Sequence, residues 1–327
     1  MSDFRGIWVA LVTPFREGEV DFVALQGLVE RLLADGVAGL VVCGSTGEAA
    51  ALSEQEQLAV LDAVLQWAPS QQVIMGLCGN NLRALLAFQQ AIQQRPLAGL
   101  LVPAPYYIRP SQSGLEAFFQ TVADAAAVPL VLYDIPYRTG VRIERETLRR
   151  IVRHPRIVAV KDCGGDPETT MALIADGNVA VLAGEDAQIF GSGCLGAVGA
   201  ISASAHIRAD LFVAMHRLLE QGDLIAARQL FYRLLPWIQV AFTEPNPAVI
   251  KAALALEGLI ADELREPMQP CSQVTQRLMQ GVLAELGSRA EEVAAIDLKS
   301  ALGDDAGVGH LRGQGPDVGS TVAMLTP

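Results

Sequence analysis

The sequence predicts a (β/α)8 barrel followed by a C-terminal helical extension, and three observations lead to this fold class. Short apolar runs, typical of strands buried on both faces, recur eight times, and segments with helical spacing separate them. Eight alternating strand and helix units favour a closed parallel barrel over an open sheet. Thr13-Pro14-Phe15 follows the first predicted strand, where an open doubly wound sheet often carries a phosphate-binding glycine turn.

The predicted strands are apolar runs rich in valine, leucine and isoleucine. In chain order they cover residues 6–12, 38–43, 73–77, 97–102, 129–133, 157–161, 179–183 and 197–201. The predicted helices between them have apolar residues three and four positions apart. Ser53 begins one of them in a capping box with Glu56, and Asn80 or Asn81 begins the next. Further helices are predicted at residues 21–33, 114–126 and 145–153.

Beyond the barrel, three more helices are predicted at residues 223–241, 247–257 and 272–286. The second is apolar almost all round and is expected to be buried or in an interface. Lys251 of this helix is nevertheless predicted to be exposed and to have no catalytic role. After Gly287 the periodicity ends, and glycine and aspartate become frequent. We therefore predict a catalytic barrel at 1–222, a helical subdomain at 223–289 and a poorly ordered tail at 290–327.

The composition argues against several classes of function. A net charge of −12 without a basic run disfavours binding to nucleic acid or to an anionic membrane surface. No apolar run is long enough to span a bilayer, and the first residues lack the features of a signal peptide. The five cysteines are widely spread without a Cys-x-x-Cys pair, as expected for reduced residues. These features predict a cytoplasmic protein.

Neither a metal nor a nucleotide cofactor is predicted. The four histidines have no metal-ligand spacing, and His206 and His216 are expected on the solvated face of one helix. The segment Gly191–Gly196 contains the spacing Gly-x-Gly-x-x-Gly. Because it follows a short helix and not a strand, we interpret it as a tight loop.

Lys161 is the central residue of the predicted site. It ends the apolar run Ile157–Val160, and the chain contains only two other lysines, Lys251 and Lys299. A desolvated lysine loses its proton more readily, and the free amine can then attack a carbonyl. The alternative is a structural lysine that extends to water or pairs with Asp162.

Other predicted strand ends carry the groups that imine chemistry needs, because the carboxyl ends of barrel strands meet at one face. These residues are the Gly44–Glu48 turn, Tyr106, Tyr107, Tyr133, Arg138 and Ile201-Ser202. A tyrosine-threonine hydroxyl chain can relay protons, a glycine-flanked turn can hold one carboxylate, and an arginine can hold a second. Together they predict a Schiff-base aldolase or lyase acting on a 2-oxo acid, in which the enamine attacks an aldehyde.

These residues resemble the motifs of the dihydrodipicolinate synthase / N-acetylneuraminate lyase family of pyruvate-dependent class I aldolases, over about residues 5–287. The matching segments are the pyruvate-carboxylate turn at Gly44–Glu48, Tyr133 with Pro136, Val160-Lys161-Asp162, and the tyrosine loop at residues 105–111. The resemblance implies a covalent imine between pyruvate and Lys161, with no other cofactor and no metal.

The resemblance also implies a role for each site residue. The expected catalytic residues are Lys161, Tyr133, Thr46 and Tyr107, and the expected substrate-binding residues are Ser45, Thr46, Gly47, Arg138 and Ile201. In the family, the tyrosine matching Tyr107 enters the neighbouring subunit's site and completes the proton relay. A homo-oligomer is therefore implied, commonly a dimer of dimers, with pyruvate and an aldehyde as its small-molecule partners.

The identity of the aldehyde depends on fewer residues. Arg138-Thr139-Gly140 resembles the synthases of the family, whose arginine binds the carboxylate of L-aspartate 4-semialdehyde and whose product is 4-hydroxy-tetrahydrodipicolinate of lysine and diaminopimelate biosynthesis. Two residues depart from those synthases, because Ser45 replaces the usual threonine and Asp134 the usual asparagine. An N-acetylneuraminate or 2-keto-3-deoxy sugar acid lyase therefore remains an alternative. A non-catalytic paralogue that binds a 2-oxo acid is another alternative. A barrel that handles phosphate esters without imine chemistry is disfavoured, because the loops after the seventh and eighth predicted strands show no convincing phosphate-binding site.

The lysine-feedback site of bacterial synthases matches only in part. Asn80 and Tyr106 agree with it, but Glu54, Gln57 and Ala84 stand where lysine-inhibited enzymes carry histidines and a glutamate. Without an acid at position 84, the ammonium group of lysine lacks its natural partner. We predict weak or absent inhibition by lysine.

Overall fold

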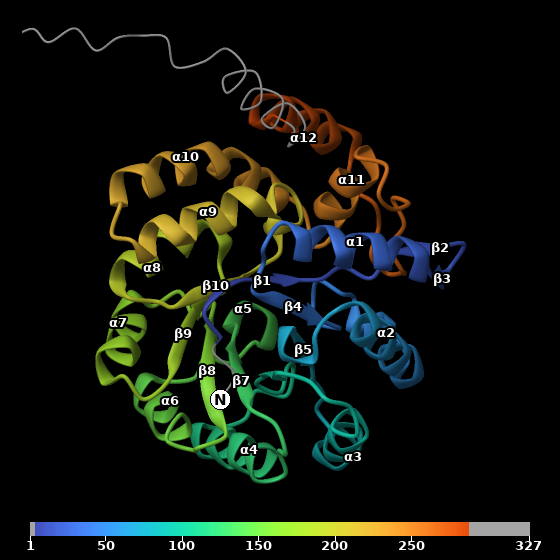
Figure 1. Cartoon of the computed structure of the whole chain (residues 1–327). Coiled ribbons are helices and arrows are strands. Elements are labelled where there is room, and N and C mark those ends of the chain that lie inside the picture. Colours follow the sequence, from blue (N-terminus) through green and yellow to red (C-terminus); the bar gives the residue numbers. More distant parts are fainter. Residues whose placement is uncertain (1–3, 288–327) are drawn as a thin grey trace, which may run out of the picture. The chain divides into compact units, whose positions relative to one another are not determined.

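A computed structural model describes residues 4–287 of the chain, and within them eight parallel strands close a barrel (Figure 1). The strands are β1 (Gly6–Ala10), β4 (Gly39–Val42), β5 (Val73–Gly76), β6 (Gly99–Pro103), β7 (Leu130–Asp134), β8 (Ile157–Asp162), β9 (Ala180–Ala183) and β10 (Gly199–Ser202). Each pairs with its neighbours in chain order, and β1 closes the ring against β10. The predicted (β/α)8 barrel is confirmed, and all eight predicted strands are present.

The helices that surround the barrel are α1 (Phe22–Ala34), α2 (Glu54–Trp67), α3 (Leu82–Ile92), α4 (Gln112–Asp124), α6 (Arg145–Ile151), α7 (Pro167–Asp176), α8 (Ile189–Leu195) and α9 (Ala209–Glu220). The predicted capping box is present, since Ser53 accepts from the Glu56 backbone N–H and Glu56 accepts from the Ser53 N–H. Asn81 caps α3. The sequence analysis missed the hairpin of β2 (Phe15–Arg16) and β3 (Glu19–Val20) and the short helix α5 (Pro136–Thr139).

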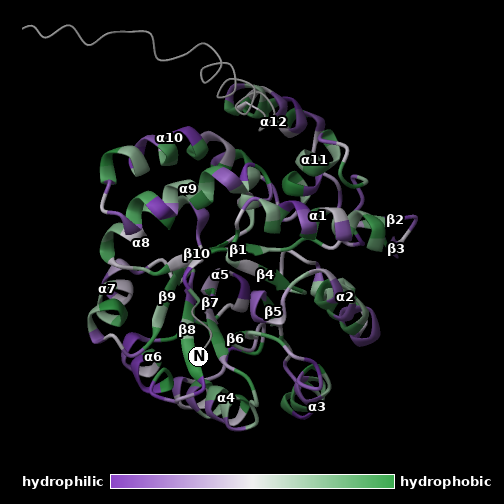
Figure 2. Cartoon of the chain, viewed as in Figure 1, coloured by the Kyte–Doolittle hydropathy of each residue, from purple (hydrophilic) through white to green (hydrophobic). Residues whose placement is uncertain are grey.

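The apolar side chains concentrate in the barrel and along the inner faces of its helices. Figure 2 shows green strands at the centre and purple residues on the outer helices. The strands are buried on both faces, as β4, β5 and β7 illustrate, because the interior of the barrel is packed and helices cover its outside. This packing fixes the positions of the strand ends.

The predicted C-terminal helices are also present, as α10 (Leu224–Ala241), α11 (Ala248–Leu256) and α12 (Gln273–Leu286). Helix α10 packs against α9 and α12, and α11 packs against α12. Residues up to Leu286 form one compact unit, so the boundary at 222 remains a prediction. The predicted tail at 290–327 lies outside the described residues. None of the described helices is both long and apolar enough to cross a bilayer.

Three local predictions are wrong. Residues 191–195 belong to helix α8 and not to a loop. His206 lies outside α9 and is buried, with Nε2 accepting from the Val12 N–H and Nδ1 contacting the Ala203 carbonyl, and burial lowers its pKa to about 4. His216 is also buried. Lys251, predicted to be exposed, is fully buried in α11, because a helix that is apolar on all sides has no solvent-exposed face.

Candidate active site

Lys161 lies at the carboxyl end of β8, where the sequence places it. It stands in register with Tyr133 of β7, and its ammonium nitrogen is 4.3 Å from the centre of the Tyr133 ring. Both side chains are buried, with exposed fractions of 6% for Lys161 and 7% for Tyr133. The lysine therefore neither extends to water nor uses Asp162, whose carboxylate accepts from the Gly164 N–H and the Thr170 hydroxyl.

The surroundings of Lys161 favour the neutral amine. Burial lowers the pKa of Lys161, and the positive charge of Arg138 acts in the same direction. The negative charges of Asp186 and Glu185 oppose this shift. Burial also raises the pKa of Tyr133, so its hydroxyl stays protonated at neutral pH and can donate or return a proton.

The turn after β4 is shaped to receive an anion. The Gly47 and Glu48 N–H groups donate within the turn, to Gly44 O at 3.1 Å and Ser45 O at 3.2 Å. Among the described residues, none accepts from the N–H groups of Ser45 and Thr46. Two adjacent free N–H groups form the kind of concavity that binds a carboxylate.

Gly47 serves this turn by its small size. A Cβ at Gly47 would lie 2.9 Å from the Leu11 carbonyl oxygen and 3.2 Å from the Cys43 nitrogen, so a side chain does not fit. The Gly47 carbonyl also accepts from the Thr13 hydroxyl at 2.8 Å. Gly47 thus allows the turn to pack closely, while the free N–H donors belong to Ser45 and Thr46, the two residues before it.

The hydroxyl groups of Thr46 and Tyr133, near Lys161, both have partners within the described residues. The Thr46 hydroxyl accepts from the Asn246 amide at 2.9 Å. Tyr133 interacts with the side chain of Ser45, and this contact slightly opposes the rise in the pKa of Tyr133. Asn246 precedes α11 and lies 200 residues from Thr46 in sequence. No local pattern in the sequence predicts this contact.

Asp186 is a second residue that the sequence analysis missed. It is buried beside the lysine cavity, and its Oδ2 accepts from four groups: the Ser202 hydroxyl, the Ala203 N–H and both the N–H and hydroxyl of Ser204. These donors favour the carboxylate, while burial raises the pKa of Asp186. The only signal in the sequence was its place after the seventh predicted strand.

The predicted residues gather around one small cavity of about 40 Å³. Its lining includes Lys161, Tyr133, Ser45, Thr46, Arg138 and Ile201, together with Glu185, Asp186 and Asn246. A neighbouring cavity of about 400 Å³ shares Ser45, Tyr133, Arg138 and Asn246 with it. The two cavities adjoin at these four residues, so a small group bound at Lys161 would lie next to the larger space.

Tyr107 is the one predicted catalytic residue that lies away from this cavity. It is 87% exposed and adopts a left-handed backbone with φ of 71°, while its N–H donates to the Thr139 carbonyl at 3.1 Å. Tyr106 beside it lines the larger cavity. The exposed Tyr107 ring lines neither of the two cavities.

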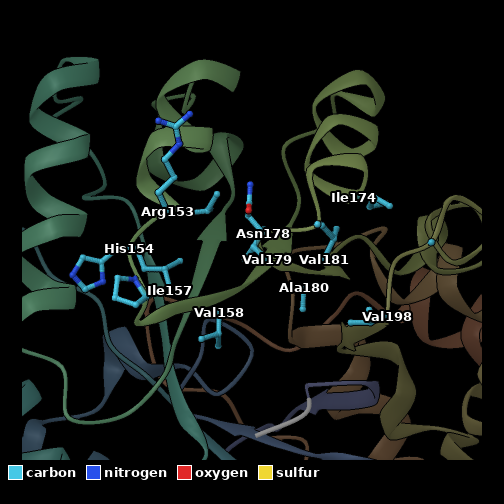
Figure 3. A pocket seen from close by; sticks show the side chains of 14 residues that line it. Arg153, His154, Ile157, Val158, Ile174, Asn178, Val179, Ala180, Val181 and Val198 are labelled. Carbon is cyan, nitrogen blue, oxygen red and sulfur yellow. The ribbon is translucent and has the colours of Figure 1, made fainter. Parts of the chain in front are cut away.

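A larger hollow, of about 700 Å³, lies at the opposite, amino-terminal ends of β8 and β9 (Figure 3). Arg153, His154 and Asn178 are its main polar residues, and aliphatic side chains form the rest. It contains none of the predicted catalytic groups. Since chemistry in barrels of this type is located at the carboxyl ends, we assign the site to the cavities around Lys161.

Metal ligands are not clustered in residues 4–287, where no three histidine, cysteine, aspartate or glutamate side chains are grouped to hold an ion. Of the five cysteines, Cys43, Cys163 and Cys271 are buried, whereas Cys78 and Cys194 are exposed. None forms a disulfide.

Comparison with known proteins agrees with this geometry. The sequence matches the model of the dihydrodipicolinate synthetase family over residues 3–286. A 4-hydroxy-tetrahydrodipicolinate synthase from Syntrophobacter fumaroxidans is 39% identical over 286 residues, which cover 86% of this chain and 98% of that protein. The chloride-inhibited dihydrodipicolinate synthase from Acinetobacter baumannii, solved with pyruvate, matches with a TM-score of 0.84 and 32% identity over 87% of this chain and 99% of that one. A monomeric dihydrodipicolinate synthase variant matches with a TM-score of 0.83 and 31% identity, over 86% and 96% of the two chains.

Proposed function

Because the chain belongs to the dihydrodipicolinate synthetase family, we propose that it is a lyase that condenses pyruvate with L-aspartate 4-semialdehyde. The product is 4-hydroxy-tetrahydrodipicolinate, an intermediate of lysine and diaminopimelate biosynthesis. The observation that carries the chemistry is the buried Lys161 amine at the end of β8, beside Tyr133 and facing the turn after β4.

In the first half of the reaction, the Lys161 amine adds to the ketone carbon of pyruvate, and loss of water gives the imine. The lowered pKa of Lys161 increases the fraction of free amine that can attack. The pyruvate carboxylate accepts from the N–H groups of Ser45 and Thr46, beside the Ile201 backbone. Tyr133 delivers the proton with which the oxygen departs as water.

In the second half, loss of a methyl proton converts the imine into an enamine, whose carbon attacks the aldehyde. The new C–C bond leaves an alkoxide, which takes up a proton. The amino group of the former semialdehyde then attacks the imine carbon, closing the ring and releasing Lys161. Arg138 is suited to hold the carboxylate of the semialdehyde, since it lines both cavities.

The proton relay also requires a second subunit in this proposal. Thr46 and Tyr133 lie in the site, and Tyr107 is exposed on the loop after β6. A Tyr107 from a neighbouring copy completes the relay, so the working form is a homo-oligomer. The exposed apolar side chain of Ile108, which follows Tyr107 in sequence, suits such a contact.

The decisive experiment is borohydride reduction of the protein in the presence of pyruvate, followed by intact and peptide mass spectrometry. We expect one stable adduct at Lys161, which disappears in Lys161→Met. A folded wild-type protein without an adduct would overturn imine chemistry with pyruvate. Rescue of a lysine-requiring mutant strain then tests the aldehyde, because a sugar-acid lyase with the same imine would trap pyruvate without rescuing growth.

A further inference from the structure

A buried ion pair lies directly behind the turn that receives the carboxylate. The Lys251 ammonium of α11 is 2.5 Å from Glu48 Oε1, and it donates to the Glu263 carbonyl at 2.8 Å. Lys251 is 0% exposed, and the Glu48 side chain is 3% exposed. Among the described residues, the ammonium is the only partner of this carboxylate oxygen. Glu48 closes the turn whose preceding residues, Ser45 and Thr46, carry the free N–H groups.

Glu48 has an unusual backbone that the pair helps to hold. Its φ of 53° and ψ of 35° are left-handed, a conformation that side chains other than glycine rarely adopt. Its second carboxylate oxygen accepts from the Arg265 N–H at 3.1 Å. The two oxygens are therefore fixed by two different segments, which restrains the backbone at the end of the turn.

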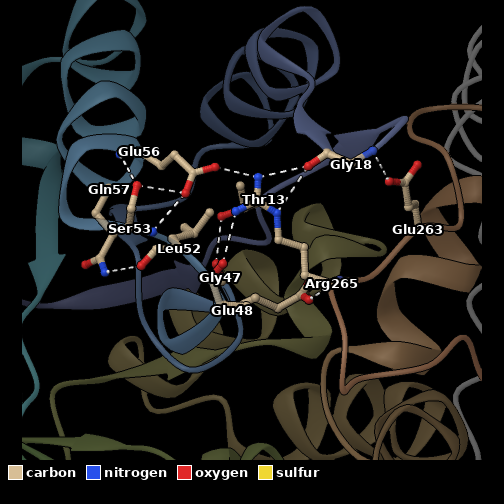
Figure 4. A network of polar contacts seen from close by, with 11 residues as sticks. Thr13, Gly18, Gly47, Glu48, Leu52, Ser53, Glu56, Gln57, Glu263 and Arg265 are labelled. Carbon is tan, nitrogen blue, oxygen red and sulfur yellow. Dashed lines mark hydrogen bonds and ion pairs between the residues drawn. The ribbon is translucent and has the colours of Figure 1, made fainter.

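Arg265 and Lys251 both contact the aromatic ring of Phe15. The Lys251 nitrogen lies 4.1 Å and the Arg265 guanidinium carbon 4.6 Å from the ring centre, within cation–π distance. Arg265 also donates to the Gly18 carbonyl and the Glu56 carboxylate, as Figure 4 shows. The hairpin, the start of α2 and the segment after α11 thus converge on Glu48.

The same segment contacts the turn at a second point. Asn246, just before α11, donates to the Thr46 hydroxyl, while Lys251, the fourth residue of α11, binds Glu48. Thr46 carries one of the two free N–H donors, and Glu48 ends the turn. Both residues are therefore held by the short segment from Asn246 to Lys251, and rigid supporting contacts are what a preorganised anion site requires.

We propose that Glu48 and Lys251 are positioning residues, whose ion pair holds the Ser45–Gly47 turn in the shape that binds the carboxylate of the 2-oxo acid. This inference rests on the proposed function and deepens it. Neither residue lines the small cavity at Lys161, and only Glu48 borders the larger one. Their loss weakens the first binding event, imine formation with pyruvate, more than it weakens the later steps at Lys161.

The test compares Lys251→Met with wild type in the borohydride reaction at increasing pyruvate concentration. We expect half-maximal trapping to need at least about tenfold more pyruvate, with the same final extent of Lys161 adduct at saturation. The KM for the aldehyde should change much less. Arg31→Met is the matched control, because it breaks the 2.5 Å pair with Glu257 at the far end of α11 and leaves the turn alone. Its trapping curve should match wild type.

A double variant, Glu48→Gln with Lys251→Met, separates positioning from the cost of an unpaired buried charge. It contains no unpaired charge, so it should be more stable than Lys251→Met while still needing elevated pyruvate. Wild-type pyruvate dependence in either variant would overturn the inference and leave the proposed function intact. A wild-type protein that forms no adduct would instead overturn the proposed function.

Discussion

Replacing Asp134 by asparagine is predicted to stabilise the protein at neutral and alkaline pH. Asp134 follows Tyr133 on β7 and stands in register with Asp162 on β8. A Cβ on Gly164 would lie 2.6 Å from Asp134 Oδ2 and 3.2 Å from Asp162 Oδ1, so both carboxyl groups face the same small space. Burial and, after it, the nearby Asp162 raise the pKa of Asp134 to about 7, against the partly opposing charge of Arg142.

The size of the effect follows from this pKa. The ordinary value is 3.8 and the folded value about 7, and each tenfold change in the proton equilibrium is worth about 1.4 kcal/mol. Ionised Asp134 therefore costs the folded state up to about 4 kcal/mol above pH 7. Since the folded pKa is raised, the folded chain retains a proton that the unfolded chain loses. Stability falls as the pH rises from about 4 to about 7 and is then level.

The assay is urea unfolding of wild type and Asp134→Asn across this pH range. The variant should gain most of its advantage between about pH 4 and pH 7, and the two proteins should be nearly equal at the acid end. Asp62→Asn is the control of opposite sign, because the Arg95 side chain lowers the pKa of Asp62. It should be less stable than wild type by a constant amount across this range, because the stabilisation from a pKa lowered below the ordinary value of 3.8 is complete above that pH and is lost only at lower pH. An Asp134→Asn advantage that is independent of pH would refute the carboxyl-pair argument.

Three further predictions concern the site. Arg138→Met should raise the KM for aspartate semialdehyde about 10- to 100-fold in steady-state kinetics, with pyruvate trapping at Lys161 unchanged; a loss of trapping would place Arg138 at the pyruvate carboxylate instead. Thr46→Val should lower kcat at least about tenfold, because it removes the hydroxyl that Asn246 contacts, whereas Thr46→Ser should retain most activity. Added L-lysine should leave the rate unchanged at sub-millimolar concentrations in the same assay. Ala84 offers no acid for the ammonium group of lysine, and the Gln57 amide already donates to the Ala49 and Leu52 carbonyls. Half-inhibition in that concentration range would contradict this prediction.

Features that depend on neighbouring residues were predictable from the sequence. The apolar run before Lys161 placed the lysine at a buried strand end, and Ser53 with Glu56 marked the start of α2. Eight such units determine the barrel, and the barrel brings its strand ends to one face. The cavity lining around Lys161 therefore contains most of the residues predicted for it. Tyr107 differs because its expected partner is another copy of the chain.

Contacts between distant segments were not predictable in this way. Asn246 is 200 residues from Thr46, and Lys251 is about as far from Glu48, so no local pattern links either pair. Yet α11 carried a usable signal. A lysine in a helix that is apolar all round has no solvent-exposed face toward which its side chain can extend. Its charge must therefore be paired with a buried acidic side chain. The only glutamate in the motif turns of the predicted site is Glu48. The apparent misfit of Lys251 thus points back to the turn that binds the substrate, and the trapping curve of Lys251→Met measures that connection directly.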